Sequence, residues 1–178
     1  MLQELKPKQY SRKEYLPNLS SIKSVRPEFL EYLIDVEGGV FAEIYDSQLG
    51  AFQTIGIGHK LQNNDSNLTD ITVEQCFKLL ENDIANAEKT VIQKLKDKNQ
   101  DYYSLTQIQK EMLIDFAFNL GPTFYLKNHE FVEAVVNNNV EQMKQNYKRT
   151  FQIKIDGWKV YKPMVDRNEK FATLFGLS

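Results

Sequence analysis

Three residues within one short stretch of the chain carry the side chains that acid and base catalysis uses. Glu37 ends an apolar helical pattern, Asp46 lies nine residues later, and Thr54 follows a glycine-containing turn. Glycoside hydrolysis needs one protonated carboxyl to protonate the leaving oxygen, and a second group that stabilises positive charge or activates water. Because an apolar setting disfavours a charged carboxylate, Glu37 suits the role of a general acid. Taken singly, these residues are more often a surface acid, a turn former and a strand residue.

Local patterns place the three residues on a helix end and a hairpin. Apolar residues recur at helical spacing up to the glycine pair that follows Glu37, and β-type segments run from Val40 to Lys60 around a turn at Ser47 to Gly50. A hairpin there would bring the second carboxylate and the hydroxyl to face the helix end.

Longer helices account for most of the remaining chain. A capping box at Thr72 and Gln75 begins a helix whose apolar stripe is long enough to connect two lobes. A second capping box at Thr106 begins the helix that we expect to be the most buried. Residues 151 to 163 are ambiguous between a short strand and a turn region, and a last helix is expected from Met164 to Phe175.

Composition limits the classes of function. The 178 residues include 22 basic and 24 acidic ones, for a formal charge of −2, so net charge predicts no broad nucleic-acid surface. Two histidines and a single cysteine, far apart in the sequence, predict no transition-metal site, and Cys76 is expected to be a buried thiol. The first 25 residues lack the apolar run of a secretory signal, and no segment is long and apolar enough to cross a bilayer.

The hairpin also carries a specific family resemblance. Tyr45-Asp46, a glycine-containing turn and then Thr-Ile-Gly-Ile-Gly-His, ending at His59, resemble the signature of bacteriophage lysozymes of the T-even type. Phe118-Asn-Leu-Gly121 resembles the second-lobe motif of the same family. The resemblance covers about residues 26 to 150 and excludes the N-terminal segment.

A fold follows from this resemblance. It implies a lysozyme-like α+β fold that is mainly helical, with a small β-hairpin lobe and a larger helical lobe joined by a long helix, and the substrate in the groove between the lobes. We expect an N-terminal arm at residues 1–25 and a catalytic domain at 26–178. Within that domain the lobes are expected at about 26–71 and 98–178, and the connecting helix at about 72–97.

The resemblance implies a muramidase that cleaves the β-1,4 bond between N-acetylmuramic acid and N-acetylglucosamine in bacterial peptidoglycan, without metal or cofactor. Glu37 matches the family's acid, Asp46 its second carboxylate, and Thr54 the hydroxyl that places the attacking water. Inversion at the anomeric carbon is expected for this type. The turn between Asp46 and Thr54 is longer than in the shortest family members, which bears on where Asp46 lies.

Four further residues receive roles from the resemblance. His59 is expected to form a structural ion pair with Asp83 on the long helix, rather than to act in catalysis. Asn119 is expected to hydrogen bond the sugar, with Phe118 as an adjacent wall, although a helix-end residue of purely structural role has the same sequence pattern.

Other functions stay open at this stage. The low net charge is compatible with a lysozyme-like module that binds glycan or a protein partner without turnover, and a lone essential glutamate is compatible with a lytic transglycosylase. Without a signal peptide, the protein is expected to be made in the host cytoplasm and to act on the wall after release, or as a virion component attached through residues 1–25. We expect a monomer with no nucleic-acid partner and no stable membrane insertion.

Overall fold

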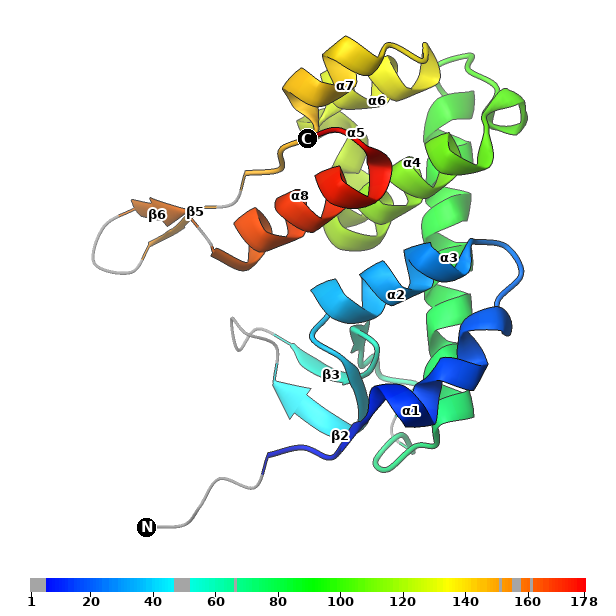
Figure 1. Cartoon of the computed structure of the whole chain (residues 1–178), viewed down its shortest axis with the longest axis vertical. Helices are drawn as coiled ribbons and strands as arrows, with labels where there is room; N and C mark the ends of the chain where they lie inside the picture. The colour runs from blue at the N-terminus through cyan, green and yellow to red at the C-terminus, as the bar shows by residue number, and fades with distance from the viewer. Residues whose placement is uncertain (1–5, 47–51, 66, 151, 155–157, 161) are drawn as a thin grey trace. The chain divides into compact units, whose positions relative to one another are not determined.

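The chain divides into two compact units, Met1–Asp83 and Ile84–Ser178. The structure, a computed structural model, describes residues 6–46, 52–65, 67–150, 152–154, 158–160 and 162–178 (Figure 1). The division between the units falls inside helix α3 (Val73–Lys96), the long helix that the sequence predicts at about 72–97. As predicted, the Thr72 backbone N–H donates to the Gln75 side chain, and the Thr72 hydroxyl accepts from the Gln75 N–H.

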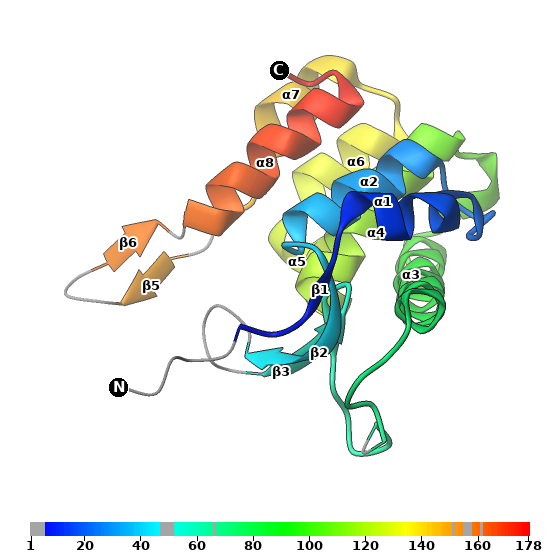
Figure 2. The same cartoon turned by 60° about the horizontal axis from the view of Figure 1, so that its bottom comes forward.

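The first unit contains one antiparallel sheet and three helical segments. The strands follow the order β1-β2-β3-β4, and Figure 2 shows the first three side by side. The strands are β1 (Gln9–Tyr10), β2 (Val40–Asp46), β3 (Gln53–Gly56) and β4 (His59–Lys60). The helical segments are α1 (Arg12–Tyr15), the 3₁₀ segment η1 (Leu16–Ser20) and α2 (Pro27–Val36), together with the first part of α3. The predicted hairpin is therefore β2 and β3.

Much of the N-terminal segment belongs to this unit. Strand β1 pairs with β2, and the side chains of Leu19, Ile22 and Val25 are buried. Part of the stretch expected to be an arm is thus packed against the body of the first unit. Helix α2 begins with Pro27 in its first turn, after an N-cap at Arg26.

The second unit is mainly helical. Its first helices are η2 (Tyr102–Ser104), α4 (Gln107–Leu120), η3 (Gly121–Thr123) and α5 (Phe124–Lys127). They are followed by α6 (His129–Val136), α7 (Val140–Asn146), the paired strands β5 (Gln152–Lys154) and β6 (Trp158–Val160), and α8 (Lys162–Phe175). The ambiguous region from residue 151 thus contains a short strand pair, and residues 155–157 between the two strands lie outside the described residues.

Helix α4 lies at the centre of the second unit. The predicted capping box is present, with the Thr106 hydroxyl accepting from the Gln109 N–H. The rings of Phe116, Phe131 and Phe171 from α4, α6 and α8 pack with centroids 4.4 to 5.8 Å apart and are fully buried. The predicted α+β, mainly helical fold is confirmed. None of the helices in the described part of the chain has the length and hydrophobicity that a bilayer-spanning segment requires.

Candidate active site

Glu37 occupies the C-terminal cap of α2 and is half-buried. Its backbone N–H donates to the Leu33 carbonyl at 3.0 Å, which fixes the residue to the last helical turn. The next two residues, Gly38 and Gly39, have φ values of 88° and 132°, and they turn the chain directly into β2. Only glycine adopts both conformations readily, so this turn places an acid at the junction of helix and sheet.

The Glu37 carboxylate lies against Gly58, the residue that precedes β4. A Cβ atom at Gly58 would stand 2.5 Å from Glu37 Oε2 and 2.8 Å from its Cδ, closer than atoms pack. Gly58 also has a φ of 70°, in the left-handed region that favours glycine. Gly58, the second glycine of the Gly-Ile-Gly-His run, therefore leaves the space that the Glu37 carboxylate occupies.

Tyr45 is a neighbour of Glu37 that the sequence analysis did not single out. Burial first, and then the negative charge of Glu37, raise the pKa of the Tyr45 phenol to about 12, although a hydrogen bond from the Gly58 backbone opposes the shift. The phenol therefore stays protonated near neutral pH. The sequence feature that could have identified Tyr45 is its position immediately before Asp46 in the hairpin.

The register of the hairpin places Thr54 beside Tyr45. Thr54 lies directly opposite Tyr45 in the antiparallel pairing of β3 with β2, so the two side chains share one face of the sheet. Thr54 is 5% exposed, and its hydroxyl donates to the Phe52 carbonyl over a long 3.4 Å. Glu37, Tyr45 and Thr54 are thus linked through contacts on one side of the hairpin.

Asp46 lies elsewhere in the same register. It is exposed and pairs with Gln53, one position beyond the Tyr45–Thr54 pair, so regular alternation directs its side chain to the opposite face. The irregularity in β2 falls between Phe41 and Tyr45, before this pair. The catalytic role of Asp46 stays a prediction. The longer turn, at residues 47–51, lies outside the described residues.

His59 contacts two carboxylates of the first unit. Its Nδ1 lies 2.8 Å from Asp83 Oδ2, the expected partner, and its Nε2 lies 3.3 Å from Asp65 Oδ2. The hydrogen bond with Asp83 is the main cause that raises the pKa of the imidazole, burial opposes the shift, and Asp65 adds to it. The histidine therefore braces β4 against α3 and the preceding loop. Asp65 was missed because its loop has no periodicity.

The candidate sugar-binding residues lie at the C-terminal end of α4 in the second unit. Phe118 and Asn119 are half-buried, and the helix ends at Leu120 before Gly121, whose φ is 65°. The side-chain oxygen of Asn119 is buried and has no hydrogen-bond partner among the described residues. An acceptor without a partner is unusual in a folded protein, and it is compatible with a ligand contact.

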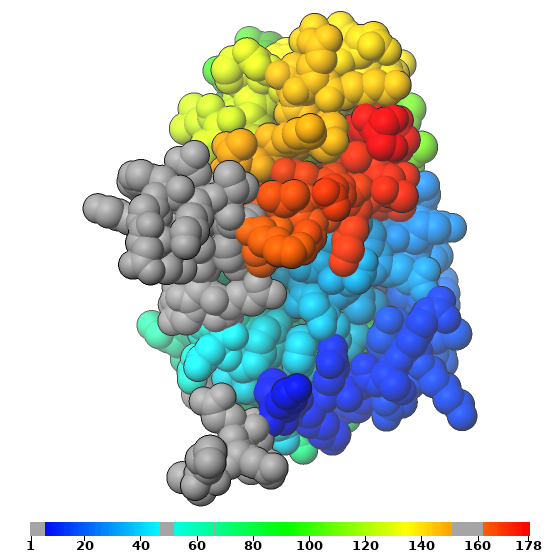
Figure 3. All heavy atoms as spheres, turned by 60° about the vertical axis from the view of Figure 1, so that its left-hand side comes forward, coloured from blue at the N-terminus to red at the C-terminus, as the bar shows by residue number. Residues whose placement is uncertain are grey.

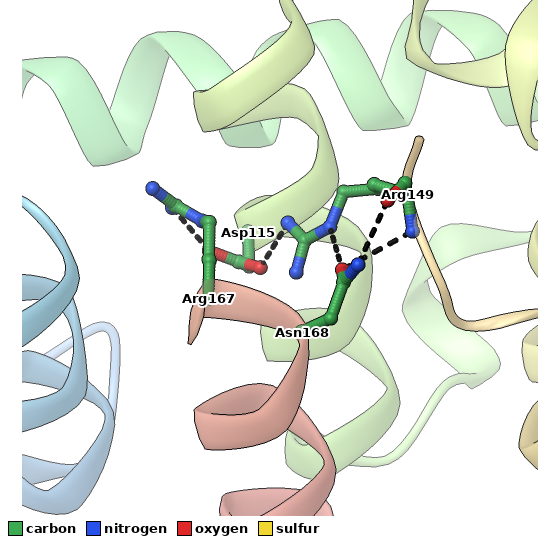
Figure 4. Close-up of polar contacts among 4 residues, drawn as sticks. All are labelled: Asp115, Arg149, Arg167 and Asn168. Atoms are coloured by element: carbon green, nitrogen blue, oxygen red, sulfur yellow. Dashed lines mark hydrogen bonds and ion pairs between the residues drawn. The ribbon is translucent and has the colours of Figure 1, made fainter. Parts of the chain in front are cut away.

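A buried ionic cluster ties α4 to α8 within the second unit (Figure 4). The two carboxylate oxygens of Asp115 accept from Arg149 and Arg167, each at 2.6 Å. The Asn168 side chain accepts a hydrogen bond from the Arg149 backbone N–H and donates one to the Arg149 carbonyl. Burial would raise the pKa of Asp115, but the charges of Arg167 and Arg149 outweigh it and lower that pKa. The guanidinium of Arg149 also lies 4.3 Å from the ring centroid of Phe116. No local pattern predicts this cluster, because three of its members, Asp115, Arg149 and Arg167, are distant from one another in the chain.

Metal and thiol chemistry find little support in the described part of the chain. Among those residues, no group of three or more His, Cys, Asp or Glu side chains gathers as metal ligands would. Cys76 is fully buried, as expected, and burial raises the pKa of its thiol to about 12. It therefore has the character of a structural thiol.

The family model named Phage lysozyme matches residues 35–170. The chain belongs to the phage lysozyme family. The match spans the helix end with Glu37, the hairpin, α4 and most of α8. A search of curated proteins found no match.

Solved structures with the same fold include proteins of phage lysozyme type. The active form of the P1 phage endolysin Lyz is 16% identical, covers 97% of this chain and 98% of its own, and has a TM-score of 0.68. The muramidase domain of SpmX from Asticaccaulis excentricus is 23% identical, with coverages of 86% and 97% and a TM-score of 0.61. The endolysin from Escherichia coli O157:H7 phage FAHEc1 is 19% identical, with coverages of 83% and 90% and a TM-score of 0.58.

Membership of the phage lysozyme family supports a lysozyme-like peptidoglycan hydrolase, an enzyme of glycoside hydrolase type. At these identities the solved structures support the fold alone.

Proposed function

We propose that this protein is a muramidase that hydrolyses the β-1,4 bond between N-acetylmuramic acid and N-acetylglucosamine in bacterial peptidoglycan. The observation that carries the proposal is the placement of Glu37, at a helix end, against Gly58 and beside Tyr45. A half-buried carboxyl at such a junction is suited to protonate the oxygen of a leaving sugar.

The chemistry proceeds by proton transfer and attack of water. Glu37 gives its proton to the glycosidic oxygen as the bond to the anomeric carbon breaks, and positive charge develops on the sugar. The Thr54 hydroxyl donates to the Phe52 carbonyl, so its oxygen can accept a hydrogen bond from water and leave a lone pair of that water for attack. The attacking water releases its proton to solvent, and Glu37 is protonated again from solvent. Direct attack of water inverts the configuration. A single-turnover assay that yields the retained anomer would contradict this assignment.

The second-unit residues and Asp46 have supporting roles in the proposal. The unpartnered oxygen of Asn119 is suited to accept a hydrogen bond from an acetamido N–H or a hydroxyl of the sugar, beside Phe118. Asp46 would act through its negative charge or on the water. The resemblance to the family supports that role, whereas the strand register does not place Asp46 beside Thr54.

A lytic transglycosylase is the second candidate, and the position of Asp46 is the observation that favours it. Asp46 pairs with Gln53, one position beyond the Tyr45–Thr54 pair, so regular alternation directs its side chain to the other face. A single glutamate suffices when the hydroxyl of the sugar itself attacks the anomeric carbon, so that the product is an anhydro-sugar instead of a reducing end. Glu37 would be needed in both reactions, and Thr54 only in hydrolysis.

Digestion of purified peptidoglycan, with mass analysis of the products, tests the proposal. Muramidase activity yields reducing N-acetylmuramic acid ends, and Glu37→Gln should lower kcat by about 100- to 10,000-fold while the fold persists. Glu28→Gln on the exposed first turn of the same helix is the matched control and should retain activity. Anhydro-sugar products would establish the transglycosylase instead.

A folded wild type that binds peptidoglycan at low and moderate salt without cleaving it would favour a binding module.

The setting of the activity is also a proposal. The protein would lyse the host from within after release from the cytoplasm, or would open the wall as a virion component. Fractionation of infected cells and of purified particles would distinguish the two settings.

A further inference from the structure

The N-terminal strand reaches the loop that carries the candidate acid. Strand β1 pairs with the start of β2, with Gln9 opposite Phe41 and Tyr10 opposite Val40. The Ala42 N–H also donates to the Lys8 carbonyl at 2.9 Å. The strand therefore runs alongside the residues that directly follow the glycine pair after Glu37.

The side chain of Gln9 fills a space that the glycine pair leaves open. Its amide Nε2 donates to the Gly38 carbonyl at 2.9 Å. A Cβ atom at Gly39 would lie 1.8 Å from the same Nε2 and 2.9 Å from Gln9 Cδ. The Gln9 amide thus packs where any larger residue at position 39 would put its side chain, and it binds the carbonyl next to Glu37.

Contacts on both sides hold Gln9 in this place. The Lys8 backbone N–H donates to Glu43 on β2 at 2.9 Å, and the Tyr10 hydroxyl donates to the Ile71 carbonyl at 2.8 Å. Figure 3 shows the N-terminal segment, in blue, lying against the cyan residues of the same unit. These contacts hold the backbone of β1 in place. The Gln9 side chain can therefore reach the loop by adopting a suitable rotamer.

We infer that Gln9 is a positioning residue for Glu37, and this inference rests on the proposed function. Two consecutive glycines with positive φ give the loop several accessible conformations. The hydrogen bond from Gln9 to the Gly38 carbonyl selects one of them and so sets the direction in which α2 delivers the acid. In this role Gln9 acts through the loop, by way of its contacts with Gly38 and Gly39.

The test compares two substitutions on the same strand. Gln9→Met keeps the length and volume of the side chain but removes the donor, and the site is exposed, so the core is undisturbed. Lys8→Met is the matched control, since the Lys8 side chain is exposed and makes an ion pair with Asp70 at 3.6 Å and a contact with the Tyr10 ring. We expect Gln9→Met to lower kcat by roughly tenfold or more through misplacement of the acid, with KM and melting temperature close to those of Lys8→Met.

Exchange of backbone amide hydrogens provides a readout that does not depend on activity. The Gly39 N–H donates to the Ile34 carbonyl at 2.9 Å, so its exchange reports the conformation of the loop. We expect faster exchange at Gly39 in Gln9→Met than in Lys8→Met. An active wild type whose kcat and Gly39 exchange are both unchanged by Gln9→Met would overturn the inference, as would equal losses of kcat in the two variants. A folded wild type that fails to cleave peptidoglycan overturns the proposed function instead, and Gly39 exchange then decides whether Gln9 holds the loop.

Discussion

Asp46 is paired with Gln53 across strands β2 and β3. Thr54 lies one position away, opposite Tyr45, so the two side chains are on the same face of the sheet. The charge of Glu37 contributes to the raised pKa of the Tyr45 phenol. Regular alternation along a strand directs the Asp46 carboxylate and the Thr54 hydroxyl to opposite faces of the sheet. The register therefore separates two residues that the sequence pattern groups together.

Substitution of these two residues will show which of them serves the reaction. We expect Thr54→Ala to lower kcat by about 5- to 10-fold through loss of one hydrogen bond to the water, and Asp46→Asn to lower it less. Steady-state kinetics on purified peptidoglycan measure both, with Gln53→Ala as a control on the face of Asp46. A loss in Asp46→Asn as large as in Glu37→Gln would identify Asp46 as the second carboxylate.

Gly58→Ala should displace the acid without changing any catalytic group. The added methyl would stand 2.5 Å from Glu37 Oε2, so the carboxylate has to move, and a shift of about 1 Å can lower the rate by roughly 100-fold. The matched control is Gly176→Ala, whose φ of 67° is close to the 70° of Gly58, but whose added methyl meets nothing within 4 Å. Both variants should lose about 1 to 2 kcal/mol of unfolding free energy from backbone strain, and only Gly58→Ala should lose kcat. Equal kcat in the two variants would contradict this placement of Glu37.

Asn119→Leu should separate ligand binding from stability. The Asn119 oxygen is buried without a partner among the described residues, so its replacement by an apolar side chain of similar size removes no hydrogen bond seen in the fold. We expect an unfolding free energy equal to that of the wild type or higher, together with a raised KM for peptidoglycan fragments. A marked loss of stability with unchanged KM would assign Asn119 a structural role.

The histidine brace predicts a pH-dependent stability. Asp83, and to a smaller extent Asp65, raise the pKa of His59 in the folded protein. The stabilisation is therefore fully present below the pKa of an unfolded histidine, about 6.5, and is lost as pH rises through the raised folded-state pKa. At pH values below about 6.5, Asp83→Asn should lower the unfolding free energy by roughly 1.5 to 3 kcal/mol. At pH values well above the folded-state pKa of His59, the substitution should change it little. Urea titrations at several pH values measure this, and an equal loss at every pH would show that the charge of His59 is not involved.

Asp115→Asn should be the most destabilising of these substitutions. It keeps the shape of the side chain but removes the charge that balances two buried guanidinium groups, and breaking a buried pair in this way costs about 3 to 5 kcal/mol. Asp166→Asn is the matched control, because Asp166 pairs with Lys162 on the exposed side of α8 and should contribute little to stability. Urea denaturation compares the two. A similar small loss in both variants would show that the cluster adds little to stability.

Much of the helical framework was predictable because it depends on local signals. The capping boxes at Thr72 and Thr106 and the apolar stripe of α3 act within a few residues, and the structure has both helices where those signals begin. The end of α2 at a glycine pair is equally local, which is why Glu37 was found at a helix terminus. Helix periodicity and glycine chemistry are properties of the sequence itself.

The missed features depend on contacts between distant parts of the chain. Strand β1 has two residues and no pattern of its own, so its pairing with β2 left no trace in the sequence. The face of Asp46 relative to Thr54 depends on the register between β2 and β3, which the sequence of either strand alone does not reveal. Arg149 and Arg167, which would be expected at the surface from their charge, are buried because Asp115 lies between them.

The two outer strands of the four-stranded sheet, β1 and β4, have two residues each. A long, flat outer strand exposes a row of unpaired backbone groups on which another polypeptide can template a cross-β assembly. Here each of the two outer strands offers such a template over only two residues. The short length of the outer strands thus protects against self-association. Lengthening β1 with alternating apolar residues would be expected to promote fibril growth.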